Sequence, residues 1–170
     1  MYSMKKAIAL SVCALAIIVS RPVLMASALS DGQIAVIREQ CESIRDDLKA
    51  LQRSDSRARV YLGRYYETIL TKFITPLNVR LVENNLSSTD FIDNQNDFNR
   101  TKTNFVIDYI EYQKVLEDLT LSDCNKEPEK FYEKLVNARA KRKIVVEDTV
   151  KLRKLISKHL ELVNGLEARL

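Results

Sequence analysis

A repeated spacing of apolar residues, by three and four positions in turn, constrains this chain more than any other feature of its sequence. Between Ile34 and Ile69, ten of the eleven positions reached by these steps are apolar or aromatic. Such a heptad pattern is typical of long helices that pack along one side. Only two glycines and two prolines lie between residues 29 and 160, which leaves little sequence for tight turns between strands. The pattern therefore predicts an all-α fold.

The first predicted helix is unusually long. Its spacing continues through Ser54-Asp55-Ser56, although these residue types often favour loops because their side chains bond to nearby backbone groups. A loop would normally reset the pattern, so we predict a single helix over residues 31–83. Ser30 and Gln33 form a candidate capping box at its start. We expect Pro76 to remove one backbone hydrogen bond and to bend the helix near its far end.

Two later stretches repeat the same spacing. A polar turn near residue 86 separates the first from the long helix, and a second break falls at residues 122–127. Three long helices with short connections favour an extended, antiparallel, coiled-coil-like three-helix bundle. The expected helices span residues 31–83, 88–121 and 128–168.

Aromatic residues are concentrated in the first two predicted helices. At heptad spacing such residues more often form a core than a ligand-stacking surface. Tyr65 falls on the predicted seam of the first helix, and Tyr66 follows it directly. Because neighbouring residues of a helix point in different directions, one of the two tyrosines is expected to be at least partly exposed.

The first 28 residues have the composition of a secretory signal peptide. Lys5 and Lys6 precede an uncharged apolar run over residues 7–19, and Ala26-Ser27-Ala28 offers the small residues that signal peptidase recognises. The run is shorter than the roughly 20 apolar residues that a membrane-spanning helix needs. This segment therefore predicts export, with cleavage after residue 28.

Cleavage would leave residues 29–170 as the helical bundle domain. The alternative is an uncleaved membrane anchor formed by residues 7–29, with the bundle outside the membrane. The leader holds three basic residues and no acidic one, so its removal changes the count from 27 basic and 23 acidic residues to 24 and 23, a net charge near +1. Nucleic-acid-binding domains are usually strongly basic, so we do not expect nucleic acid as a partner. Membrane contact is expected only through an uncleaved leader.

Two cysteines, Cys41 and Cys124, remain once the leader with Cys13 is removed. An even pair in an oxidising compartment predicts a disulfide, whereas the same pair in a cytosolic protein would more often be buried thiols. The predicted turns place Cys124 about one heptad, or roughly 10 Å, from Cys41 along the bundle. The loop at residues 122–127 must therefore reach toward the start of the first helix for the bond to form.

No group of residues has the spacing of a catalytic, metal or cofactor site. The single histidine, His159, falls on a seam position without partners of matching spacing. We therefore expect neither enzyme activity nor a cofactor. Asp55 is a polar residue within the first seam, and such residues more often fix helix register than form a buried site. The predicted alignment places Asp55 within a turn of Arg139 and Arg142, which favours a structural ion pair.

Basic residues gather on the first and last predicted helices, at what should be the same level of the bundle. Such a surface can bind an anionic envelope polymer, lipid headgroups or an acidic partner. Carboxylates of the middle helix at Asp108, Glu111, Glu117 and Asp118 could instead neutralise it and leave an ordinary solvated surface. We name this set the basic belt: Arg57, Arg59, Arg64, Arg139, Lys141, Arg142, Lys143, Lys151, Arg153 and Lys154.

Four stretches of the chain stand out together: Arg64–Leu70, Pro76–Leu81, Asp123-Cys124 and Pro128–Tyr132. They resemble a group of uncharacterised exported helical proteins from small-genome bacteria. The resemblance implies export, but the group has no known function to transfer.

Together these features predict a non-enzymatic, exported or envelope-associated helical module with an interaction or structural role. A protein or another component of the cell envelope is the expected partner, and the oligomeric state is left open. Two alternatives remain. The basic belt could bind an anionic polymer or membrane surface, or the helices could hold unfolded clients as a chaperone does, which requires exposed apolar surface.

Overall fold

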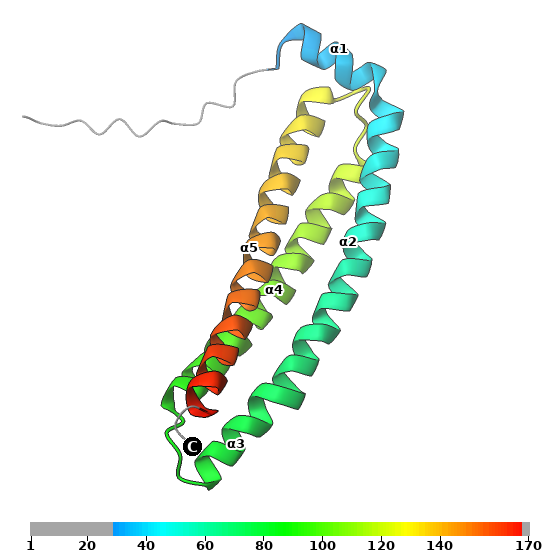
Figure 1. The fold of residues 1–170 in the computed structure, drawn as a ribbon. Coiled ribbons are helices and arrows are strands. Elements are labelled where there is room, and N and C mark those ends of the chain that lie inside the picture. The colour runs from blue at the N-terminus through cyan, green and yellow to red at the C-terminus, as the bar shows by residue number, and fades with distance from the viewer. Residues whose placement is uncertain (1–28, 168–170) are drawn as a thin grey trace, which may run out of the picture.

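The computed structural model describes residues 29–167, and this part of the chain is all-helical, without a strand (Figure 1). The prediction of an all-α fold is therefore confirmed. No helix within the described range is long and apolar enough to cross a membrane. The predicted signal peptide lies outside the described residues. In chain order the elements are α1 (Asp31–Glu39), α2 (Cys41–Ile69), the π-helical turn η1 (Leu70–Ile74), α3 (Thr75–Glu83), α4 (Thr89–Leu121) and α5 (Pro128–Glu167).

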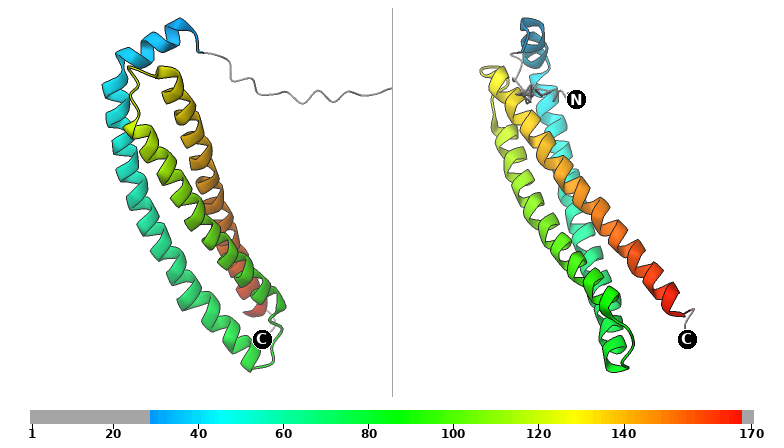
Figure 2. Two further views of the ribbon diagram at one scale, coloured as in Figure 1. Left: turned by 180° about the vertical axis from the view of Figure 1, so that it is seen from behind. Right: turned by 90° about the vertical axis from the view of Figure 1, so that its left-hand side faces the viewer.

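The long helices form an elongated bundle. In Figure 1, α2 and α5 run in one direction and α4 runs in the opposite direction between them. Helices α4 and α5 pack closely against each other, whereas α2 packs mainly on α4 and makes few close approaches to α5. Figure 2 shows that the C-terminal end of α5 also lies apart from α3. The bundle is therefore tightest between α4 and α5 and more open on the side between α2 and α5.

The two later stretches with the repeated spacing form α4 and α5, whose ends agree with the predicted ends to within one residue. Every seventh residue of α5 from Phe131 to His159 is buried. These positions meet a row of large side chains on α4, which makes the α4–α5 interface the main core of the protein. That row consists of Phe91, Phe98, Phe105, Tyr109, Tyr112, Leu116 and Leu119.

The prediction of one unbroken helix over residues 31–83 is wrong near its start. The helix breaks at Gln40, whose φ of −97° and ψ of 10° are not helical. None of the residues of α1 is buried, so no apolar seam holds α1 in line with α2. Instead α1 turns across the end of the bundle and lies beside the start of α5 (Figure 1). The predicted capping box of Ser30 and Gln33 is present, and α2 does continue through residues 54–56 as predicted.

The predicted bend near Pro76 takes the form of the π-helical turn η1. Here the Thr75 N–H donates to the Leu70 carbonyl, five residues back. Proline has no N–H and its ring crowds the preceding turn, and a wider turn accommodates both effects. Four residues of an α-helix turn about 40° more than a full circle, so residues four apart drift around the helix. The wider turn offsets this drift and keeps Leu70, Ile74 and Asn78 buried on one side.

The predicted seam of the first helix is wrong at Tyr65. Tyr66 is the buried residue, at 1% exposure, whereas Tyr65 is 41% exposed. An α-helix has 3.6 residues per turn, so a strict heptad pattern drifts by about 20° per repeat, and the drift has moved the buried face by one residue. The Tyr66 ring packs edge-on against Phe98 and Phe105, with centroid distances of 6.2 and 5.8 Å.

A disulfide joins Cys41 at the start of α2 to Cys124 in the loop between α4 and α5. Their Cα atoms are 5.6 Å apart. Both residues are buried. The loop therefore reaches across to α2, as the predicted pairing required.

Candidate functional site

A cavity of about 180 Å³ lies between α2 and α5, with α4 as its floor. Thr149 of α5, which lines this cavity opposite α2, is only half-buried. We name this region the α2–α5 groove. Its lining residues are Asp55, Ala58, Arg59 and Leu62 from α2, Phe105, Tyr109 and Tyr112 from α4, and Arg142, Val145, Val146 and Thr149 from α5.

Asp55 and Arg142 form an ion pair across the groove. Nε and Nη2 of Arg142 donate to the two carboxylate oxygens over 2.8 and 3.2 Å. The Tyr112 hydroxyl donates to the same carboxylate over 2.8 Å. Of the two arginines predicted near Asp55, Arg142 therefore makes the contact, and Arg139 does not. The cluster ties α2 to both other long helices.

The electrostatics of this cluster keep Asp55 ionised. Burial raises the pKa of its carboxyl group, but the hydrogen bonds from Arg142 and Tyr112 outweigh burial and leave the pKa below 3.8. The hydrogen bond to Asp55 raises the pKa of Arg142. Burial and the nearby carboxylate also raise the pKa of Tyr112. A general acid or base works best with a pKa near the operating pH, so the cluster has the chemistry of a fixed ion pair.

Replacement of Asp55 by asparagine is expected to lower the free energy of unfolding by about 1–3 kcal/mol, because Arg142 and Tyr112 lose a charged acceptor. The Asp55 side chain is 15% exposed, so water replaces the lost contacts only in part. Urea unfolding at neutral pH measures the change. Asp46→Asn, which removes an exposed carboxylate paired only with Lys49, is the control and should have little effect.

The wild type and Asp55→Asn can also be compared in acid. A lowered pKa means that the Asp55 carboxylate stabilises the fold above pH 3.8 and that this contribution is lost as the pH falls below that value. The wild type and Asp55→Asn should therefore converge in stability at low pH. A difference that stays constant down to low pH would contradict the role given to the charge.

The basic belt does not come together as one surface. Four of its members have carboxylate partners: Arg142 with Asp55, Lys141 with Glu111, Lys143 with Glu147, and Lys151 with Asp148. Of the basic belt, only Lys141 is therefore neutralised by a carboxylate of the middle helix, that of Glu111. Within the described part of the chain, the remaining belt members have no carboxylate within ion-pair distance. They are Arg57, Arg59, Arg64, Arg139, Arg153 and Lys154.

Two of these unpaired cations, on α5, lie about one helical turn from residues that line the groove. Arg139 precedes Arg142 by three residues and Arg153 follows Thr149 by four, so each shares a helix face with a lining residue. The positive charge of Arg153 also opposes the burial that raises the pKa of Tyr66. Arg153 itself lines a shallow hollow on α5, next to Val150 and Lys154.

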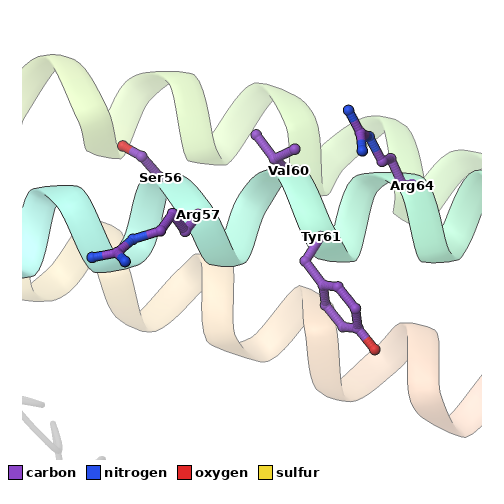
Figure 3. A pocket seen from close by; sticks show the side chains of 5 residues that line it. All are labelled: Ser56, Arg57, Val60, Tyr61 and Arg64. Atoms are coloured by element: carbon purple, nitrogen blue, oxygen red, sulfur yellow. The ribbon is translucent and has the colours of Figure 1, made fainter.

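The other unpaired cations are more scattered. The Arg59 guanidinium lies over the Tyr109 ring at 5.2 Å and so contributes to the floor of the groove. Arg57 and Arg64 line a shallow hollow on α2 together with Tyr61, and in Figure 3 Arg64 is directed toward α4. Lys154 lines a shallow hollow on α5 together with Val150 and Arg153. The predicted belt thus separates into paired cations and scattered unpaired ones.

Large apolar residues of α2 and α5 are also exposed, and one of them, Val146, lines the groove. Tyr61 on α2 is 69% exposed and points toward α5 in Figure 3. On α5, Val146 lines the groove, Val150 follows about one turn later, and Leu160 lies nearly four turns beyond Val146. Single exposed apolar residues are common on proteins, but several beside one groove are typical of interaction sites. Sequence reasoning missed them, although the apolar residues at Val146 and Val150, four positions apart beside the seam, were a usable signal.

His159 lies elsewhere, buried between α4 and α5. Its ring packs edge-on against Phe91 at 5.7 Å, and its Nδ1 atom has no hydrogen-bond partner among the described residues. Burial lowers the pKa of the imidazole below 6.5. Residues 29–167 also hold no cluster of three or more side chains suited to a metal ion. The histidine therefore belongs to the core.

Protonation of this histidine gives a further expected result. Because its pKa is lower in the folded protein, the unfolded chain binds the proton more readily, so stability is lost as the pH falls below 6.5. Replacement of His159 by leucine should remove this loss. Urea unfolding of both proteins at about pH 8 and about pH 5 measures it. A parallel pH dependence of the two proteins would contradict the assignment.

Comparison with protein-family models, curated proteins and solved structures finds no match to this chain. The resemblance to exported proteins of small-genome bacteria stays a prediction. What the structure offers toward a function is the α2–α5 groove, the unpaired basic residues and the exposed apolar residues of α2 and α5.

Proposed function

We propose that this protein is a non-enzymatic, exported helical module that binds a partner protein through the α2–α5 groove. The observation that carries the proposal is the set of exposed apolar residues on the two helices that border the groove, such as Tyr61 and Val150, together with Arg139 and Arg153 of α5, which have no carboxylate within ion-pair distance among the described residues. Aromatic residues and arginine are enriched in protein interfaces and supply most of their binding energy.

The leader and the disulfide support the exported location. The first 28 residues have the composition of a signal peptide. The bond between Cys41 and Cys124 is the kind that persists in an oxidising compartment. In this proposal the working form is residues 29–170, an extended antiparallel three-helix bundle in which α2 and α3 together act as the first long helix.

A protein partner fits the groove better than an anionic polymer or a lipid surface. Polymers and headgroups bind through charge, and they would leave Tyr61, Val146 and Val150 without an apolar contact. The exposed apolar residues do favour a second candidate function, a holdase-like chaperone. A holdase would bind many unfolded clients regardless of the charges of Arg139 and Arg153, so reversal of these charges separates the two functions.

The proposal is tested by purifying the tagged full-length protein from the organism that makes it, after reversible crosslinking. We expect the protein outside the cytoplasm, with Leu29 as its first residue, together with a specific partner. Arg139→Glu combined with Arg153→Glu should abolish recovery of that partner. Lys114→Glu combined with Arg80→Glu, which reverses two exposed charges away from the groove, should not. A cytoplasmic protein, or equal recovery with both double variants, would contradict the proposal.

A further inference from the structure

Ion pairs recur at heptad spacing along the interface between α4 and α5. Lys134 of α5 bonds to Asp118 of α4 over 3.0 Å. Seven residues later on α5, Lys141 bonds to Glu111 of α4. The next residue at this spacing, on the same face of α5, is Asp148. A carboxylate therefore stands where this row twice holds a lysine, and its charge needs another source of compensation.

Asp148 meets a second carboxyl group across the interface. Its side chain is only 2% exposed, and Asp108 of α4 lies within hydrogen-bonding distance of it. Lys151 donates to Oδ1 of Asp148 over 3.2 Å, whereas Oδ2 has no hydrogen-bond partner among the described residues. Two ionised carboxylates are both acceptors and cannot bond to each other. A proton on one of them would supply the missing donor.

We propose that Asp108 and Asp148 share a proton, and that this carboxyl pair is an acid-stabilised latch between α4 and α5. With the proton bound, the O–H of one carboxyl group donates to an oxygen of the other in a charge-assisted hydrogen bond. Without the proton, two negative charges repel each other within the tightest helix pair of the bundle. The latch acts between helices that already pack together, so it is independent of any partner in the α2–α5 groove.

The charged groups around the pair agree with a shared proton. Burial raises the pKa of Asp108 above 3.8, and the hydrogen bond and negative charge of Asp148 raise it further. The carboxylate of Glu111 acts in the same direction, and the positive charge of Lys141 opposes it. Both lysines beside the pair already have carboxylate partners, Lys141 with Glu111 and Lys151 with Asp148. Among the described residues, these groups of α4 and α5 set the charge around Asp108, without a contribution from α2.

The raised pKa of Asp108 fixes the direction of the pH dependence. A carboxyl group that binds its proton more readily in the folded protein stabilises the fold below pH 3.8, and this contribution is lost as the pH rises above that value. Asp55 has the opposite dependence, because its pKa is lowered. The latch is therefore measured as a difference between variants at each pH, in which the contribution of Asp55 cancels.

Asp108→Asn imitates the protonated pair, because its amide carries no charge and can donate to Asp148. In urea unfolding of the full-length protein at about pH 7.5, this variant should have a higher midpoint than the wild type, and the difference should shrink at about pH 4. Asp118→Asn is the matched control, because it neutralises a carboxylate of the same helix that is paired with Lys134. It should not raise the midpoint. A midpoint of Asp108→Asn at or below that of the wild type, or a gain equal at both pH values, would overturn the proposal.

The proton itself can be followed by NMR of the Asp108 side-chain carboxyl carbon. In the wild type this carbon should titrate with a midpoint above pH 3.8. Asp148→Asn should lower the midpoint, because it removes the like charge and leaves an amide that can donate to Asp108. A midpoint at or below 3.8 in the wild type, or an unchanged midpoint in Asp148→Asn, would show that the two groups share no proton.

A divalent cation is the other ligand that two carboxylates can hold. The lysines beside the pair repel a cation, and two carboxyl groups are fewer than the six to eight oxygen ligands that Ca²⁺ takes. Added Ca²⁺ should therefore leave the urea midpoint of the wild type at about pH 7.5 unchanged, relative to sodium chloride of the same ionic strength. Stabilisation by Ca²⁺ that is absent in Asp108→Asn would identify a cation site and overturn the shared proton.

Discussion

Replacement of Tyr66 by alanine is expected to lower the free energy of unfolding by about 3–5 kcal/mol, the range for removal of a buried aromatic ring. Tyr66 is 1% exposed, and its ring contacts Phe98 and Phe105 on α4. Removal of this ring would leave a cavity where α2 is anchored to the main core. Urea unfolding followed by circular dichroism measures the loss.

Tyr65 supplies a matched control one residue away. It has the same side chain in the same helix, but it is 41% exposed. Tyr65→Ala is therefore expected to change the free energy of unfolding by less than about 1 kcal/mol. Equal losses for the two variants, or a larger loss for Tyr65→Ala, would contradict the packing of α2 described above.

Loss of the disulfide is expected to have an effect of similar size. Cys41 and Cys124 close a loop with a sequence separation of 83 residues. In the chain-entropy model such a closure stabilises the folded protein by about 4 kcal/mol, because it restricts the unfolded chain. The double variant Cys41→Ala with Cys124→Ala should lose about this amount in urea unfolding. The loop between α4 and α5 should then detach from the start of α2.

Reduction provides an independent check of the same bond. A reducing agent should lower the stability of the wild type to nearly that of the double variant, and it should have no effect on the double variant itself. A wild type whose unfolding is unchanged by reduction would contradict the contribution given to the disulfide.

The heptad pattern was sufficient to predict much of the fold, because the apolar positions of α4 and α5 are determined by their contact with each other. The break at Gln40 could not be predicted in this way. It depends on whether α1 has a partner to pack against in line with α2, and no residue of α1 is buried. The heptad pattern also could not show that Tyr66, rather than Tyr65, is the buried residue. A heptad spacing falls behind the turn of an α-helix by about 20° per repeat, and this difference shifts the buried face by one residue only after several repeats.

The candidate site was predicted only in part. The basic residues of the belt could be found from composition, but their pairing depends on which helices lie close together. Lys141 meets Glu111 because α4 and α5 are in close contact, whereas Arg139 and Arg153 have no carboxylate within ion-pair distance among the described residues. The exposed apolar residues Val146 and Val150 were missed because the heptad pattern assigns those positions to solvent.

The most direct test of the proposed interaction face is site-specific photocrosslinking in cells that make the protein. A photoreactive amino acid replaces either Tyr61, beside the groove, or Ile107, an exposed apolar residue on α4 two positions past the buried Phe105. The α2–α5 groove predicts a discrete crosslinked product at position 61 that disappears with Arg139→Glu and Arg153→Glu, and no such product at position 107. Crosslinking to the same partner at position 107 alone, or equally at both positions, would contradict it.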